Sequence, residues 1–184
     1  MLDNTVLDDF IGDFRLNRKY GISIVSRDNI LELKTAGYTV EDMLDYLGKT
    51  NNSLYHGSRD IISDSNLKPG ERGEVCCSDL SAIAIMKAII SNIFETAPFN
   101  LGYWYHIDEQ HPMGLEITGI HDDTIGENGY VYVINQRHSF KNNPKGSWQY
   151  VARDQTVPIN ARISVERIDY TYPIYDITNK RRIQ

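Results

Sequence analysis

Cysteine, tryptophan and long apolar stretches are scarce in this chain. Its only cysteines among 184 residues, Cys76 and Cys77, are neighbours. Adjacent strand residues point to opposite faces, so we do not expect an ordinary disulfide between them. Reduced thiols are typical of the cytoplasm. No apolar run approaches the ~20 residues that span a bilayer, and the acidic stretch from Met1 to Phe10 lacks the basic start of a signal peptide. We therefore expect a cytoplasmic protein with no membrane partner.

Positive charge is scarce as well. Lysine and arginine together number 19 against 25 aspartates and glutamates, which gives a net charge of −6. The one basic cluster, Lys180 to Arg182, lies at the chain end, where we interpret it as a solvated tail. Nucleic-acid-binding proteins usually carry a basic face. We therefore expect no nucleic-acid partner.

Apolar residues are abundant enough for a folded core. They make up 41% of the chain, with 24% charged residues, so the chain need not be disordered. Twelve tyrosines supply rings that suit half-buried positions. The length fits one domain with at most a small appendage.

The first 50 residues predict a helical segment. Apolar residues recur there at helical spacing, Ser26 can cap a helix over 27–36, and Thr39 with Asp42 can cap another that ends at Gly48. Two short helices in succession also suggest a DNA-binding helix-turn-helix. The second one carries three acids and no basic residue, which phosphate would repel. We interpret the segment as a packing or partner-binding cap.

The remainder, residues 51–184, predicts an α+β domain. We place its boundary in the polar run at 49–52. A dense apolar pattern predicts one long helix from 79 to about 94, with Ser78 as its cap. Short β runs stand on both sides of it, without the regular helical crossovers of a doubly wound sheet. The predicted strands cover 54–56, 74–77, 103–107, 115–120, 130–134, 148–152, 159–165 and 168–175.

Four segments in this order resemble ADP-ribosyltransferases. Leu54-Tyr55-His56-Gly57-Ser58 is similar to the Tyr-His-Gly-Thr/Ser strand of bacterial members, including the rifampin ADP-ribosyltransferases. The resemblance spans about residues 53 to 170, and its other segments are Val75 to Asp79 with Ala82, Tyr130 to Phe140, and Gly146 to Val151 followed by Val157-Pro158. It implies a mixed, mainly antiparallel split β-sheet with one long helix, and NAD as the substrate.

The resemblance also implies roles for particular residues. His56 would bond a ribose hydroxyl, and the backbone of Gly57 would pair with the nicotinamide carboxamide, because no Cβ stands in the way. Ser58 and Ser78 would add contacts to NAD, and Tyr103 or Tyr105 would stack on the nicotinamide. The ADP-ribose would pass to an unidentified protein or small-molecule acceptor.

Gln149 departs from the pattern. The family carries a catalytic carboxylate at this place, which stabilises an oxocarbenium-like state. Glutamine bonds but has no charge, and losing one such group typically costs ~10²–10³ in rate. Asp154 or Glu166 could supply the carboxylate, Gln149 could act slowly as it stands, or the domain could bind a nucleotide without transferring it.

Other interpretations stay open from the sequence. A related fold performs RNA 2′-phosphotransfer, for which the nearby basic candidates are Arg59, Arg72 and Arg153. His106 and His111 could ligate a metal, but no third ligand follows at a matching spacing, so we expect no metal. Ser78 fits a helix cap better than a nucleophile. The His-Gly-Ser strand end and Gln149 could also be purely structural.

Overall fold

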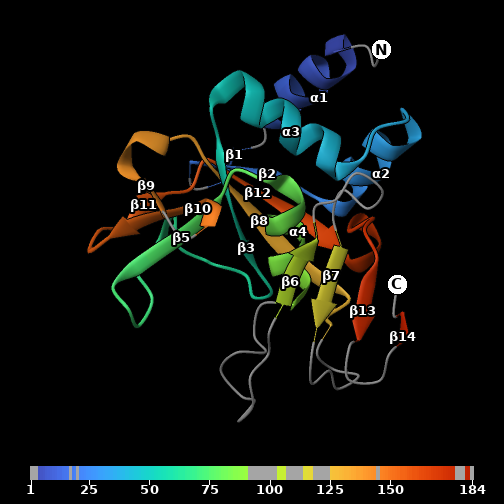
Figure 1. Ribbon diagram of the computed structural model, residues 1–184. Helices are drawn as coiled ribbons and strands as arrows, with labels where there is room; N and C mark the ends of the chain where they lie inside the picture. Colours follow the sequence, from blue (N-terminus) through green and yellow to red (C-terminus); the bar gives the residue numbers. More distant parts are fainter. Residues whose placement is uncertain are drawn as a thin grey trace.

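The described part of the chain contains four helices and a large twisted sheet, with two smaller sheets beside it (Figure 1). The computed structural model describes residues 4–16, 18–19, 21–90, 103–106, 114–117, 125–143, 146–176 and 181–182. The described helices are α1 (Asn4–Leu16), α2 (Arg27–Thr35), α3 (Val40–Asn51) and α4 (Ser81–Ile90), with short 3-10 turns η2 (Arg137–Ser139) and η3 (Arg167–Asp169). None of the helices within these residues has the length and apolarity to cross a membrane.

The main sheet has eight strands, and only β2 and β12 pair in parallel. From one edge to the other the strands are β1 (Arg18–Lys19), β2 (Ile22–Val25), β12 (Ala161–Glu166), β8 (Asn128–Ile134), β3 (Leu54–Ser58), β5 (Glu74–Ser78), β10 (Gly146–Arg153) and β9 (Lys141–Asn143). The predicted combination of helices with a mainly antiparallel sheet is confirmed in this general form.

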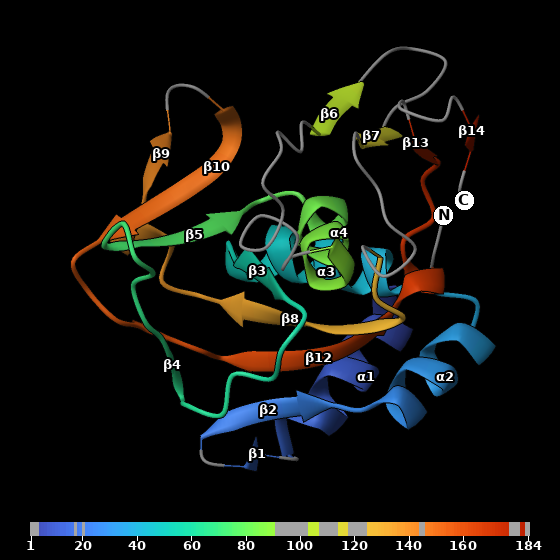
Figure 2. The same ribbon diagram turned by 90° about the horizontal axis from the view of Figure 1, so that it is seen from below.

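Two smaller sheets accompany the main one. β4 (Asn66–Leu67) pairs with β11 (Val157–Pro158), and a second sheet has the order β14 (Arg181–Arg182), β13 (Ile174–Asp176), β7 (Gly114–Ile117) and β6 (Tyr103–His106). Figure 2 shows the main strands passing beneath α4, with β6 and β7 beyond it. The region 168–175, predicted as one strand, instead contains η3 and the start of β13.

Each face of the main sheet has its own apolar core. The helix side joins Ile30 and Met43 from the helices to Tyr55 and Val131 of the sheet. The opposite side gathers Leu54 and its neighbours under β4 and β11. Strand residues alternate between these two cores because successive side chains point to opposite faces. This alternation assigns each strand residue of the candidate site to one face.

The sequence predicted a purely helical N-terminal segment, but the structure also places two strands there. Strands β1 and β2 lie between α1 and α2, and β2 joins the main sheet alongside β12. α3 also passes through Gly48 and ends at Asn51, so the polar run at 49–52 belongs to its last turn and C-cap. The helices of this segment pack into the same core as the sheet.

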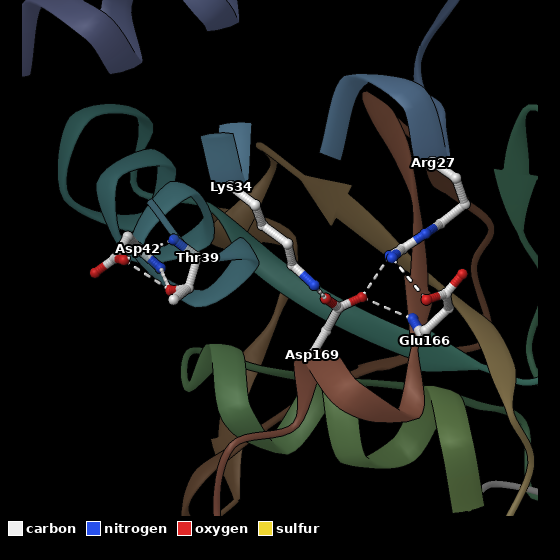
Figure 3. Close-up of polar contacts among 6 residues, drawn as sticks. All are labelled: Arg27, Lys34, Thr39, Asp42, Glu166 and Asp169. Carbon is white, nitrogen blue, oxygen red and sulfur yellow. Dashed lines mark hydrogen bonds and ion pairs between the residues drawn. The ribbon is translucent and has the colours of Figure 1, made fainter. Parts of the chain in front are cut away.

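Helices α2 and α3 begin at the predicted caps. Ser26 and Asn29 form a reciprocal capping box at α2. Thr39 and Asp42 form another at α3, which Figure 3 shows. Each box satisfies backbone N–H groups that a helix start leaves without partners. These local bonds explain why the two helix starts were readable from the sequence.

A buried carboxylate ties α2 to the end of β12. Asp169 accepts from Arg27 at 2.6 Å and from Lys34 at 2.5 Å, both on α2, while Arg27 also binds Glu166 at 2.7 Å (Figure 3). The backbone N–H of Glu166 donates to the same carboxylate. Because a buried charge is stable only when it is paired and hydrogen-bonded, this network fixes α2 against the sheet.

Helix α4 packs on the sheet at two bare strand positions. A Cβ built on Gly57 of β3 would lie 2.0 Å from the carbonyl oxygen of Ala84, and one built on Gly129 of β8 would lie 2.0 Å from that of Ala88. Real Cβ atoms do not approach backbone so closely, so only glycine permits this packing.

The substitution Gly129→Ala tests this packing at a position outside the candidate site. We expect it to destabilise the fold by about 3 kcal/mol, since the added methyl group would displace α4. Denaturant unfolding followed by circular dichroism measures the change. Gly12→Ala is the matched control, because Gly12 lies on α1 with no atom within 4 Å of its added Cβ, and it should stabilise by about 0.5–1 kcal/mol. Equal stability of Gly129→Ala and wild type would contradict the close approach.

Candidate functional site

Three of the predicted site strands are neighbours in the sheet. Ser78 of β5 pairs with Tyr55 of β3 on one side and with Gln149 of β10 on the other. His56 follows Tyr55 directly. Strands in a sheet lie ~4.8 Å apart, so the Cα atoms of Tyr55 and Gln149 are separated by about 10 Å. Segments almost a hundred residues apart therefore meet at one level of the sheet.

The sheet divides between β3 and β5. These strands share one residue pair, Tyr55 with Ser78, whereas β3 stays paired with β8 along its whole length. β5 likewise stays paired with β10 through five residues. Beyond Tyr55, the residues His56, Gly57 and Ser58 of β3 no longer pair with β5. The strand pairing is therefore interrupted in the middle of the sheet.

His56 bridges this division. Its Nδ1 lies 2.8 Å from the carbonyl oxygen of Cys76 on β5. A carbonyl only accepts, so Nδ1 carries the proton and Nε2 is left as an acceptor. The ring is half-buried, with its centroid 6.3 Å from that of Tyr132. Burial lowers the pKa of His56, and the bond to Cys76 opposes that shift only in part. The imidazole is therefore neutral at physiological pH.

Gly57 does not have the open face that the sequence predicted. The space where its Cβ would stand is filled by the backbone and Lys87 Cβ of α4. A flat ring cannot lie over this side of the glycine. What remains for a ligand is the edge of β3, where the strand has left β5. The glycine is needed for helix packing, and a ligand would approach its backbone from the side.

Ser58 and Ser78 both use their hydroxyl groups locally. Ser58 donates to the carbonyl oxygen of Asp60 at 2.9 Å, and Ser78 accepts from the backbone N–H of Leu80 at 3.0 Å. Since α4 begins at Ser81, Ser78 is not its N-cap, which corrects the prediction. Ser78 is buried and stabilises the turn that leads from β5 into α4.

Gln149 lies in a polar cluster on the α4 face. Its Oε1 accepts from Nδ2 of Asn143 on β9 at 2.6 Å, and its side chain bonds the thiol of Cys76. Burial raises the pKa of that thiol, against the weaker effect of Gln149, so it is protonated. Lys87 of α4 interacts electrostatically with Cys76, and burial lowers the pKa of Lys87 to about 8. The cluster offers an amide, a thiol and an easily deprotonated amine.

His56 and Gln149 leave the sheet on opposite faces. Ser78 and Gln149 share the face of Tyr55, which belongs to the helix-side core. His56 alternates with Tyr55 and so shares the face of Leu54 in the opposite core. His56 and Gln149 could therefore contact the same ligand only across the place where β3 and β5 stop pairing, which we call the gap.

Neither alternative carboxylate lies beside Gln149. Glu166 is at the end of β12, where it pairs with Arg27. Asp154 lies past the end of β10, where its backbone N–H donates to the carbonyl oxygen of Gly73 at 2.8 Å. The suggestion that one of them replaces the missing acid is therefore wrong. Arg153, one of the basic candidates of the phosphotransfer alternative, pairs with Glu74 at 2.9 Å while its side chain stays largely exposed.

The aromatic candidates lie on another sheet. Tyr103 and Tyr105 belong to β6, which pairs with β7 and not with the main sheet. Their side chains, like the imidazole of His106 and all of His111, fall outside the described residues. Among the residues that the structure does describe, no group of three or more His, Cys, Asp or Glu side chains could hold a metal.

Three residues of the cluster were missed by reasoning from the sequence: Cys76, Lys87 and Asn143. Lys87 had a usable signal, because it is the single charged residue of the otherwise apolar α4. A lysine in such a helix indicates a polar surface facing it. Asn143 had none, since its role depends on the pairing of β9 with β10.

Comparison with known proteins places the chain in no group: no described family, no curated protein and no solved structure matches it. The likeness to ADP-ribosyltransferases therefore stays a prediction that depends on four short segments and their order.

The ring of His56 offers a direct test of the bridge between β3 and β5. Nitrogen-15 NMR should show the tautomer protonated at Nδ1 and a pKa below the usual 6.5, with the signal assigned by its loss in His56→Gln. The folded state resists protonation more than the unfolded chain. The stability due to His56 should therefore be complete above pH 6.5 and decrease as pH falls toward the folded-state pKa. A proton on Nε2, or a raised pKa, would contradict the bridge.

Proposed function

We propose that this protein binds NAD as an ADP-ribosyltransferase-like protein of the cytoplasm and transfers ADP-ribose to an acceptor. The observation that carries the proposal is the division of the sheet at the His-Gly-Ser strand. The resemblance implied a mixed, mainly antiparallel split sheet. The two free thiols, Cys76 half-buried and Cys77 buried, agree with a reducing compartment.

His56 suits the binding of a ribose hydroxyl. Its Nδ1–H is used by Cys76, so Nε2 can accept the proton of a hydroxyl group. Burial keeps the ring neutral, and neutrality is what an acceptor nitrogen requires. The carbonyl of Cys76 thus orients the imidazole before any ligand arrives, and this saves ordering entropy on binding.

Gly57 suits binding along its edge. A carboxamide carries one donor and one acceptor group, which match the N–H and C=O of a strand edge that has lost its partner. Helix α4 covers the face of the glycine and blocks stacking there. The nicotinamide would therefore pair with β3 in the plane of the sheet, in the gap that β5 leaves.

Catalysis would be slow with the residues present. Gln149 has no negative charge to stabilise an oxocarbenium-like state, and Lys87 adds a partly protonated amine to the same face. A positive charge on Lys87 would raise the free energy of the oxocarbenium-like cation as it forms. The proposal therefore assigns Gln149 to ligand positioning, with a transfer rate well below that of a carboxylate-bearing site.

The second candidate is a binding module of the same kind without transferase activity. Two observations favour it: the amide of Gln149 in the acid's place and the covered face of Gly57. Such a module would bind a nucleotide in the gap and present it, or its own surface, to a partner.

Titration calorimetry with NAD tests the ligand. We expect saturable binding that weakens about tenfold in His56→Ala, the equivalent of one good hydrogen bond. His138→Ala is the matched control, since His138 is exposed on η2. Absence of binding to the wild type at millimolar NAD would overturn the assignment of this ligand.

Gln149→Glu distinguishes the transferase from the silent module. Restoring a carboxylate should raise the rate of NAD cleavage by about 10²–10³, measured as nicotinamide release. Oε1 of Gln149 already accepts from Asn143, so a glutamate oxygen can take the same bond. Gln136→Glu adds the same charge before η2 and should leave the rate unchanged. If Gln149→Glu binds NAD but cleaves none, the binding module is the better description.

A further inference from the structure

A groove lined mainly by polar and charged residues runs along β10 beside β9. Its volume is about 420 Å³. Its lining consists of Ser139, Lys141, Asn142, Val151, Arg153 and Gln155. The set contains two cationic side chains, three neutral hydrogen-bonding ones and one apolar residue, with no carboxylate. In a chain whose net charge is −6, the two cationic side chains give this groove a local excess of positive charge, which Glu74, paired with Arg153, offsets in part.

The groove adjoins the candidate site on the same face of the sheet. Gln149, Val151 and Arg153 alternate along β10, so their side chains point to one side. Successive residues of one face lie about 7 Å apart along a strand. The groove therefore begins one such step from Gln149, with Lys141 of β9 paired beside Val151.

The two cations of the groove differ in how they are held. Arg153 is fixed by Glu74 at 2.9 Å, although its side chain remains largely exposed. Lys141 is exposed on the short edge strand β9. Gln155 is held by its bond to the carbonyl oxygen of Ser139, 2.9 Å away. A small anion could be bound by both charges while the neutral side chains contribute hydrogen bonds.

We propose that this groove binds the anionic group, phosphate or carboxylate, of a small-molecule acceptor. The acceptor role rests on the proposed transferase function, whereas the anion site stands on the groove alone. With its anionic group bound in the groove, an acceptor would place its nucleophilic oxygen or nitrogen near Gln149. That atom would form the bond to the ribose carbon as nicotinamide leaves with its electron pair, and the acceptor's proton would pass to water.

Titration of the whole protein tests the site, with inorganic phosphate in one arm and succinate in the other, followed by amide NMR shifts. We expect saturable shifts at β9 and β10 with at least one of them. Binding should weaken about fivefold or more in Lys141→Gln and in Arg153→Gln. Lys68→Gln is the control, because Lys68 is an exposed lysine paired with Asp64 elsewhere on the surface. It should bind like the wild type.

The outcomes separate this site from the NAD proposal. Phosphate binding alone would identify a phosphorylated acceptor, and succinate binding alone a carboxylate. No saturable binding of either, or equal weakening in Lys68→Gln, would overturn the groove even if NAD binds. Displacement of phosphate by NAD would assign the groove to the NAD pyrophosphate and overturn the acceptor role. If the protein binds an anion in this groove but does not bind NAD, the anion site stands and the proposed transferase function is overturned.

Discussion

The close contact of α4 with Gly57 and Gly129 determines the geometry of the centre of the sheet. The helix backbone lies where two Cβ atoms would otherwise be, so β3 and β8 are held directly beneath it. α4 begins three residues after Ser78, and its position therefore also limits where β5 can run. β5 shares one residue pair with β3 and then follows β10. The strand edge that a ligand would use is thus a consequence of how tightly the helix packs.

The same packing determines the electrostatics of the gap. α4 brings Lys87 to the sheet, where burial favours its neutral amine. On the other side of the sheet, burial favours neutral His56, whose proton is committed to Cys76. His56 is therefore neutral, whereas Lys87, with a pKa of about 8, still carries its proton in most molecules near pH 7. A neutral imidazole would bind a ligand through a hydrogen bond, as the proposed contact with a ribose hydroxyl requires.

Features governed by local bonds were predictable, and those governed by distant partners were not. The capping boxes of Ser26 and Thr39 depend on residues three positions away, so the sequence predicted both helix starts. Strand β2 is stable because it pairs with β12, almost 140 residues later, and four residues between helices gave no sign of it. The glycine in the His-Gly-Ser strand indicated a close approach. Whether a ligand or a helix approaches depends on α4, which no local pattern reveals.

In the proposed function, Gln149 is the residue that would separate binding from catalysis. Asn143 donates to its oxygen, and its NH₂ group can donate to further partners. An NH₂ group donates to a ribose oxygen and cannot withdraw a hydroxyl proton. A carboxylate in the same place would accept that proton and add negative charge beside Lys87. The surrounding residues therefore fit a side chain that holds a ligand, and the protonated amine of Lys87 would stabilise the carboxylate of a Gln149→Glu variant.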